Sequence, residues 1–154
     1  MSISNRKVVI VGAGHVGSHV GYALISQSLA DEIVYIDSDR AKAVAQALDL
    51  TDATNYLPVR TKVTAGDYSD AKDAQIMIIS AGPLPTGNQT RMDTLGQTIA
   101  ILKDVTKSIK ESGFDGIIVN ISNPADVITH YIQHTLNWVP ERIFSTSTTL
   151  DSAR

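Results

Sequence analysis

The chain has 154 residues, no cysteine and a formal net charge of −3, which together exclude several classes of protein. Its length suits one domain with a substantial hydrophobic core. Without cysteine there is no disulfide framework, no thiol nucleophile and no thiolate metal site. The small negative charge gives no basis for nucleic acid binding, no apolar run is long enough to cross a bilayer, and the first residues lack the hydrophobic segment of a signal peptide. We therefore expect a cytoplasmic protein that contacts neither nucleic acid nor membrane.

Apolar runs typical of strands alternate with stretches of helical periodicity along the whole chain. We predict six strands, at Lys7–Val11, Glu32–Asp37, Arg60–Ala65, Ala74–Ala81, Gly116–Ile121 and Arg142–Ser147. We predict four helices, at Gly14–Gln27, Arg40–Thr54, Thr94–Glu111 and Ala125–Thr135. Such alternation is typical of the α/β class, in which helices cover both faces of a parallel sheet. The expected fold is a doubly wound six-stranded sheet of order 3-2-1-4-5-6, with its ligand at the carboxyl ends of the strands.

A glycine motif joins the first predicted strand to the first predicted helix. It reads Gly12-Ala13-Gly14-His15-Val16-Gly17. In such a motif the first glycine permits a tight turn, the second lets the backbone approach a diphosphate, and the third lets the helix pack close to the strand. Amide groups at the helix N-terminus then hold the phosphates. The motif predicts a Rossmann dinucleotide-binding fold, with Gly12, Gly14, His15, Val16 and Gly17 at the cofactor.

Asp37, at the end of the second predicted strand, indicates which dinucleotide is bound. Its carboxylate can accept two hydrogen bonds from a ribose diol, and it would repel a 2'-phosphate. We therefore predict NAD rather than NADP as the cofactor.

Further polar residues follow the later predicted strands. The loop from Ala81 to Arg91 is rich in Pro and Gly, which is typical of a mobile lid. Arg91, at its far end, either reaches over a bound ligand or is simply a solvated arginine. After the fifth strand, Asn123-Pro124 has two readings. In the structural one it ends the strand and starts a helix. In the functional one the Asn123 amide lies beside the nicotinamide and the substrate and donates to a carbonyl or hydroxyl oxygen. Ala81, Gly82 and Ile121 complete the predicted cofactor contacts.

These landmarks together resemble the L-lactate/malate dehydrogenase family over essentially the whole chain. The resemblance lies in the Gly12–Gly17 loop with Asp37, Gly66-Asp67-Tyr68, the loop from Ala81 to Arg91, Asn123-Pro124 and Leu150-Asp151-Ser152-Ala153-Arg154. Within the family, the segments Glu111–Phe114 and Ile121–Thr129 look most like the L-2-hydroxyisocaproate dehydrogenase branch, which handles longer aliphatic 2-hydroxy acids.

The resemblance implies a role for each matching residue. Arg91 matches the lid arginine that polarises the substrate carbonyl, and Asn123 matches the asparagine that is hydrogen-bonded to the substrate oxygen. Asp151 matches the carboxylate that orients a catalytic histidine. Arg154 matches the arginine that pairs with the substrate carboxylate, a task suited to a planar guanidinium. The implied reaction is hydride transfer between NAD and a 2-hydroxy or 2-oxo acid such as 2-ketoisocaproate, in a dimeric or tetrameric enzyme.

The chain also departs from the family pattern. Pro85 stands at the substrate-reading position of the lid, where proline fits an apolar substrate side chain and argues against a dicarboxylate. Ser145 and Ser147 stand where the family commonly has glycines, and they either narrow the nicotinamide pocket or add hydrogen bonds. The family's catalytic histidine belongs to a segment after Arg154. None of the four histidines of this chain is placed to replace it: His15, His19, His130 and His134.

His130 and His134 share one predicted helical face, which suits either a metal pair or a surface. Because no third ligand accompanies them, we favour the surface and predict no metal.

We expect residues 1–147 to form the dinucleotide-binding domain of a longer enzyme and residues 148–154 to begin its substrate domain. Alone, such a chain would bind cofactor but turn over little. Two alternatives stay open, namely L-lactate dehydrogenase and a non-catalytic NAD-sensing regulatory domain.

Overall fold

Six strands form one parallel sheet in the order β3-β2-β1-β4-β5-β6, which confirms the predicted topology. The structure is a computed structural model that describes residues 5–58, 60–83, 86–90 and 92–153, with the backbone alone for Leu150 and Asp151. The strands are β1 (Lys7–Val11), β2 (Glu32–Ile36), β3 (Lys62–Ala65), β4 (Ile76–Ile79), β5 (Ile117–Asn120) and β6 (Ile143–Ser145).

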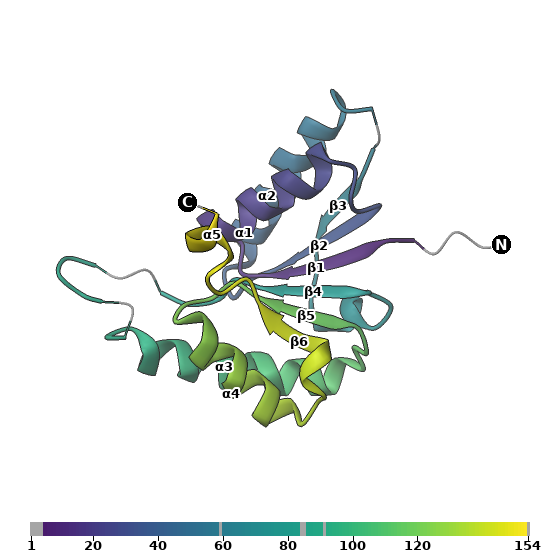
Figure 1. The fold of residues 1–154 in the computed structure, drawn as a ribbon. Coiled ribbons are helices and arrows are strands. Elements are labelled where there is room, and N and C mark those ends of the chain that lie inside the picture. The colour runs from purple at the N-terminus through teal and green to yellow at the C-terminus, as the bar shows by residue number, and fades with distance from the viewer. Residues whose placement is uncertain (1–4, 59, 84–85, 91, 154) are drawn as a thin grey trace.

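The four long helices are divided between the two faces of the sheet. Helices α1 (His15–Ser26) and α2 (Arg40–Thr54) lie on one face, and α3 (Leu95–Ser112) and α4 (Ala125–Leu136) lie on the other (Figure 1). This follows from right-handed crossovers, because the chain first steps from β1 towards β3 and later steps the opposite way from β4 to β6. None of the helices in the described ranges is long and apolar enough to cross a membrane.

Several elements differ from their predicted bounds. The predicted strand Ala74–Ala81 is shortened to β4, and Arg142–Ser147 is shortened to β6. The two strands end at Ile79 and Ser145, the last residues that pair with a neighbouring strand, although Ala81 and the β-branched Thr146 still suit a strand. Three short elements were not predicted as such: the 3₁₀ turns η1 (Tyr68–Ala71) and η2 (Pro140–Arg142), and the helix α5 (Thr149–Ser152).

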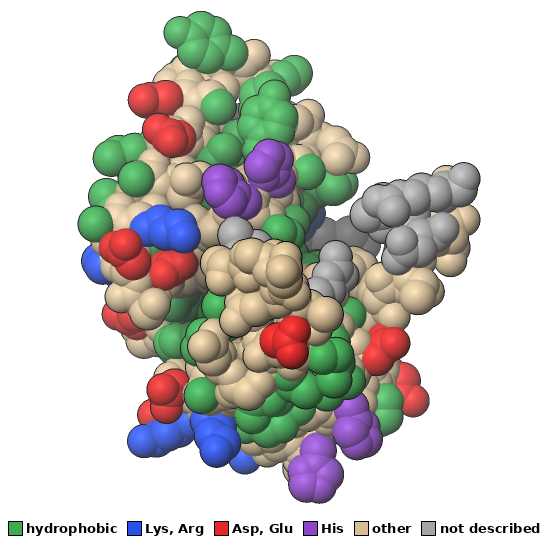
Figure 2. Space-filling view, turned by 90° about the vertical axis from the view of Figure 1, so that its left-hand side faces the viewer, with side chains coloured by type: hydrophobic (Ala, Val, Ile, Leu, Met, Phe, Trp, Pro, Cys, Tyr) green, Lys and Arg blue, Asp and Glu red, His purple; other side chains and the backbone are tan. Residues whose placement is uncertain are grey.

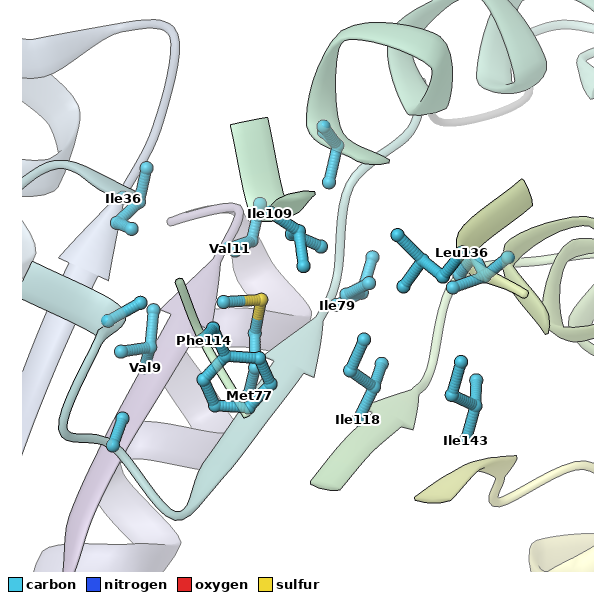
Figure 3. Packing of buried hydrophobic residues seen from close by; sticks show 14 of the residues in the cluster. Val9, Val11, Ile36, Met77, Ile79, Ile109, Phe114, Ile118, Leu136 and Ile143 are labelled. Atoms are coloured by element: carbon cyan, nitrogen blue, oxygen red, sulfur yellow. The ribbon is translucent and has the colours of Figure 1, made fainter. Parts of the chain in front are cut away.

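Two hydrophobic clusters lie on the two faces of the sheet. One packs between the sheet and α3 and α4, and it contains Met77, Ile79 and Ile118 from the sheet together with Leu136 from α4 (Figure 3). The other lies beneath α1 and α2 and is centred on residues such as Tyr35. Because successive strand residues point to opposite faces, strands β1, β2 and β4 supply residues to both clusters.

Tyr35 reaches through the second cluster to α1. Its side chain is buried, and its hydroxyl donates a hydrogen bond to the Gly17 carbonyl oxygen at 3.1 Å. A Cβ atom on Gly21, one turn further along α1, would collide with that hydroxyl and lie 2.9 Å from Leu50 Cδ1. The glycine therefore provides the space in which strand β2 and helix α1 make contact.

We expect Gly21→Ala to lower the free energy of unfolding by about 1–3 kcal/mol, because the added methyl group overpacks a buried contact. Urea denaturation measures the change. Gly96→Ala is the matched control, since a Cβ there meets no atom within 4 Å, and it should be neutral or slightly stabilising. Equal effects of the two substitutions would show that Tyr35 does not set the spacing of α1.

Arg6 and Asp31 tie the start of β1 to the start of β2. The Arg6 guanidinium donates to Asp31 Oδ1 at 2.8 Å, and the Arg6 amide donates to Asp31 Oδ2 at 2.9 Å. These hydrogen bonds from Arg6 lower the pKa of Asp31 from 3.8 to about 2. Because the pKa of Asp31 is lower in the folded chain than in the unfolded chain, ionised Asp31 stabilises the fold. This stabilisation is fully present at pH values above the pKa of the unfolded chain, and it is lost as the pH falls towards the pKa of the folded chain.

Asp31→Asn should therefore lower the midpoint of urea unfolding at pH 7 slightly, and the difference from the original chain should disappear between pH 4 and pH 2. The effect is small because the pair is solvent-exposed. Urea titrations across this pH range measure it. A difference that persisted at pH 2 would mean that the residue stabilises the fold by something other than its charge.

Candidate functional site

The glycine loop lies where β1 ends at the carboxyl edge of the sheet. Gly12 has a φ of +102°, and its amide donates to the Ile36 carbonyl oxygen at 2.8 Å. A Cβ on Gly12 would lie 2.5 Å from the Ser80 carbonyl oxygen, and one on Gly17 would collide with the Gly12 carbonyl oxygen. These two glycines therefore close the turn and bring α1 against β1, as the motif predicts.

Gly14 serves a different purpose from its two neighbours. A Cβ there would meet only Lys42 Nζ, at 3.8 Å, so the folded chain itself leaves room for a side chain. The absence of a side chain instead exposes the backbone at the start of α1. That helix has no side-chain cap and no acidic residue in its first turn, whereas α2 is capped by Asp39, which accepts from the Lys42 amide. The free N-terminus of α1 is suited to an external anion.

Asp37 follows β2 and reaches the glycine loop. Its Oδ2 accepts a hydrogen bond from the Ala13 amide at 2.7 Å, and its Oδ1 accepts one from the Asp39 amide at 2.9 Å. The carboxylate thus holds the loop in shape while it remains half-buried at the edge of a cavity. The sequence suggested only the ribose contact, and the structure adds this second role.

Two adjoining cavities form a groove across the carboxyl edge of the sheet. This edge lies on the side of the molecule that faces the viewer in Figure 2. Their volumes are about 540 and 680 Å³, within the range of cofactor pockets. They share the residues in the middle of the groove: Gly14, Lys42, Ser80, Ala81, Gly82 and Pro83. The first cavity continues to His15, Val16, Thr94, Ile121, Ser122 and Asn123. The second continues past Gly12, Ile36 and Asp37 to Gly66, Asp67 and Tyr68.

The groove therefore brings together nearly all the residues predicted to contact the cofactor. Gly17 is the exception, since it packs beneath the loop and does not line either cavity. The Asp37 end is separated from the Asn123 end by the glycine loop. An elongated molecule with an anionic centre fits this order of residues.

Sequence reasoning assigned no role to several residues that line the groove. Lys42 is an exposed cation on the first turn of α2 and lines both cavities. Arg40 lies beside it and donates to the Gly66 and Ala65 carbonyl oxygens at 2.7 and 3.2 Å, which joins α2 to the end of β3. Burial raises the pKa of Tyr68 to about 12, with Asp37 and Asp104 contributing, so its hydroxyl stays neutral. The sequence signal for these contacts was the presence of two basic residues, Arg40 and Lys42, shortly after Asp37.

Asn123 owes its position to a buried neighbour that the sequence analysis did not single out. Asn120, the last residue of β5, is fully buried. Its Nδ2 donates to Thr129 Oγ1 at 3.0 Å and to the Ala125 carbonyl oxygen at 3.1 Å, and its Oδ1 accepts from the Ser122 amide at 3.0 Å. This network fixes the turn between β5 and α4, which presents Asn123 exposed at the groove. Pro124 precedes the first residue of α4 as its N-cap rather than lying in its first turn.

The residues predicted to act on the substrate are only partly described. Pro85, Arg91 and Arg154 lie outside the described residues. The backbone of Asp151 lies in α5, and its side chain is outside what the structure describes. The structure therefore places Asn123 at the groove and does not test whether the other four approach it.

The structure describes how Ser147 is accommodated at a position where the family commonly has glycine. It has a φ of +37°, a conformation that glycine adopts more readily, and its hydroxyl donates to Asp126 Oδ1 at 2.5 Å. Neither Ser145 nor Ser147 lines the two cavities. Of the two readings, the structure favours an added hydrogen bond over a narrowed pocket for Ser147.

The histidines lie in two separate groups on this face of the molecule (Figure 2), since His15 and His19 belong to α1 and His130 and His134 to α4. No group of three His, Cys, Asp or Glu suited to a metal ion occurs in the described part of the chain.

The fold and the groove define a dinucleotide-binding domain of the Rossmann type. The family model described as lactate/malate dehydrogenase, NAD binding domain, matches residues 6–145. The chain belongs to the lactate/malate dehydrogenase family and comprises its NAD-binding domain. The prediction of NAD as the cofactor is thereby confirmed.

Curated relatives and solved structures match the chain over 90% or more of its length. It is 42% identical over 154 residues to L-lactate dehydrogenase 3 of Bacillus cereus, of which it covers 49%. The minor L-lactate dehydrogenase of Enterococcus mundtii in its ligand-bound form is 39% identical, with a TM-score of 0.91 over 96% of this chain and 47% of that one. Malate dehydrogenase of Archaeoglobus fulgidus in complex with NADH is 31% identical, with a TM-score of 0.84 over 90% and 48%. The chain thus spans about half the length of the curated relatives it matches.

Proposed function

We propose that the chain is the cofactor half of an NAD-dependent L-2-hydroxyacid dehydrogenase. In this proposal residues 1–147 form the dinucleotide-binding domain, and residues 148–154 begin the substrate domain. The observation that carries it is the groove, which runs from Asp37 past the uncapped start of α1 to Asn123. NADH, when bound, supplies the hydride that reduces a 2-oxo acid.

In this proposal, different groups of groove residues bind different parts of the cofactor. The backbone from Gly12 to Gly17, with His15 and Val16, holds the diphosphate, and Asp37 accepts hydrogen bonds from the adenosine ribose. Ala81, Gly82, Ile121 and Asn123 enclose the nicotinamide half. The cation of Lys42 lies beside Gly14 and offsets the charge of the phosphates.

The substrate residues act at the Asn123 end of the groove. Asn123 donates a hydrogen bond to the substrate oxygen, and Arg91 polarises the same carbonyl when the loop closes. Arg154 pairs with the substrate carboxylate, and Asp151 orients a histidine that the family carries in the part of the protein after this chain. That histidine moves the proton, so we expect the 154-residue chain by itself to bind cofactor and turn over little.

The substrate we propose first is pyruvate, with L-lactate as the product. The Bacillus cereus relative and the Enterococcus mundtii structure are L-lactate dehydrogenases, which favours this reading over the hydroxyisocaproate branch that the motifs around residues 111–129 suggested. Pro85 supports an apolar substrate side chain in either case. Steady-state reduction of pyruvate and of 2-ketoisocaproate by the full-length protein distinguishes the two. A higher kcat/KM for 2-ketoisocaproate than for pyruvate would make 2-ketoisocaproate the preferred substrate. If the protein reduced neither acid, the proposal would be overturned.

Asn123→Ala in the full-length protein should lower kcat/KM for pyruvate by about 10²-fold, because a donor to the developing oxyanion is lost. NADH affinity should change much less. Asn55→Ala is the matched control, since Asn55 is exposed at the end of α2 and bonds only locally to the Asp52 carbonyl oxygen. Unchanged kinetics for Asn123→Ala would remove Asn123 from the substrate site.

We further propose that the full-length enzyme is a homo-oligomer. Helices α1 and α2 expose several large apolar side chains on their outer surfaces, among them Tyr22 and Leu48. Exposed apolar side chains gathered on neighbouring helices are typical of an association surface.

A further inference from the structure

The second cavity of the groove extends past Asp37 to one side of α3. Four residues of that helix line it: Ile101, Asp104, Val105 and Ser108. The later three follow Ile101 by three, four and seven positions, a spacing that places side chains on one side of an α-helix. We call these four residues the α3 stripe. The contacts proposed for the diphosphate, the ribose and the nicotinamide leave the α3 stripe without a ligand group.

Part of the α3 stripe is apolar. Ile101 is 40% exposed although it is apolar and lines the cavity, and Val105, one turn further along the helix, is 7% exposed. Ile36, the last residue of β2, lines the same cavity. A flat aromatic ring against this surface would remove the exposed part of Ile101 from water, which favours binding.

The charge of the α3 stripe comes from Asp104. Asp104 is exposed, and within the described part of the chain its carboxylate has no hydrogen-bond or ion-pair partner. The cation of Arg40 lines the same cavity, but it donates to the Gly66 and Ala65 carbonyl oxygens, at 2.7 and 3.2 Å. Because a carboxylate accepts hydrogen bonds and donates none, Asp104 presents acceptor oxygens to a ligand in the cavity.

Tyr68 connects Asp104 with the ribose end of the cavity. Burial raises the pKa of Tyr68 to about 12, and the charges of Asp37 and Asp104 contribute to this increase. Both carboxylates therefore lie near the same hydroxyl group, one after β2 and the other on α3. In the proposed binding mode Asp37 accepts from the adenosine ribose, and the base is attached to that same ribose. The base is thereby brought within reach of the α3 stripe.

We propose that Asp104 selects the base of the dinucleotide. Its carboxylate accepts a hydrogen bond from the exocyclic amino group of adenine, while the ring packs on Ile101 and Val105. A purine with an oxo group in place of the amino group brings a second acceptor against the carboxylate and binds less tightly. This inference rests on the proposed function, in which the ribose lies at Asp37.

Two reduced dinucleotides that differ at this one group of the base test the proposal, namely NADH and reduced nicotinamide hypoxanthine dinucleotide. Both carry the same fluorescent dihydronicotinamide, so fluorescence titration of the full-length protein gives both dissociation constants without any substrate. Asp104→Asn is the main variant, because a side-chain amide can present either an acceptor or a donor. Glu111→Gln is the matched control, since it removes a carboxylate from an exposed position of the same helix that lines neither cavity.

In the original protein we expect NADH to bind at least about tenfold more tightly than the hypoxanthine analogue. Asp104→Asn should bring the two affinities to within about threefold, because the analogue gains a donor while NADH keeps an acceptor. Glu111→Gln should leave the ratio unchanged. Equal affinities in the original protein, or a ratio that persists in Asp104→Asn, would overturn the proposal. An equal fall of the ratio in Glu111→Gln would overturn it as well.

The ratio of two affinities distinguishes base selection from a general effect on the fold, because a loss of stability weakens both dinucleotides alike. Two further measurements keep the proposed function separate. Pyruvate reduction by the full-length protein tests the reaction, and NADH titration of Asp37→Ala tests the position of the ribose. If both gave their expected results while the affinity ratio failed, Asp104 alone would lose its role.

Discussion

Gly12→Ala is expected to abolish NADH binding and to destabilise the fold. At a φ of +102° an alanine is strained, and its Cβ would lie 2.5 Å from the Ser80 carbonyl oxygen. The strain costs about 1–3 kcal/mol and the overpacking a similar amount. Their sum is a large part of the 5–15 kcal/mol that is typical of a domain. Urea denaturation and fluorescence titration with NADH measure the two effects.

Gly14→Ala is the comparison that separates folding from binding. The chain itself has room for this Cβ, so the free energy of unfolding should hardly change. NADH binding should nevertheless weaken by at least about tenfold, because the methyl group occupies the place where the diphosphate approaches the backbone. Normal NADH binding by Gly14→Ala would contradict the proposed position of the phosphates. Normal stability of Gly12→Ala would contradict the geometry of the turn.

Asp37→Ala is expected to weaken NADH binding by about 10- to 100-fold, the loss that corresponds to hydrogen bonds made by a charged group. NADPH should bind weakly to the original chain. On Asp37→Ala the affinity for NADPH should fall less than the affinity for NADH, because the carboxylate that repels a 2'-phosphate is removed. Fluorescence titration of the 154-residue chain with both cofactors measures the change in preference.

The second role of Asp37 requires a control, because the carboxylate also accepts from the Ala13 amide at 2.7 Å. Asp37→Asn keeps an acceptor for that amide but removes the charge. If ribose binding and charge are what matter, Asp37→Asn should retain most of the stability and still shift the preference towards NADPH. A loss of NADH affinity in strict proportion to the loss of stability would mean that Asp37 acts only by holding the loop.

The sequence was most informative where local pattern and function coincide. The apolar runs identified all six strands, and α2 has its predicted bounds, Arg40–Thr54. The glycine spacing indicated the turn, the helix start and the proposed phosphate site together, because Gly12 and Gly17 meet local steric requirements and Gly14 leaves the backbone exposed at the start of α1. Strand ends were less predictable, since a strand stops where its partner turns away and not where its own residues cease to be apolar.

The amino-acid sequence by itself thus determined the class of fold, the strand order, the glycine loop and the choice of NAD, since these depend on short-range pattern and on the handedness of crossovers. Only the tertiary structure decided that Asn120 holds the turn of Asn123, that Lys42 lies beside Gly14, and that Asp37 anchors the Ala13 amide. Only the tertiary structure, likewise, brought Asp104 of α3 to the cavity that Asp37 borders. Each of these depends on residues far apart in the chain, whose proximity is fixed by packing of the whole sheet and not by any local preference.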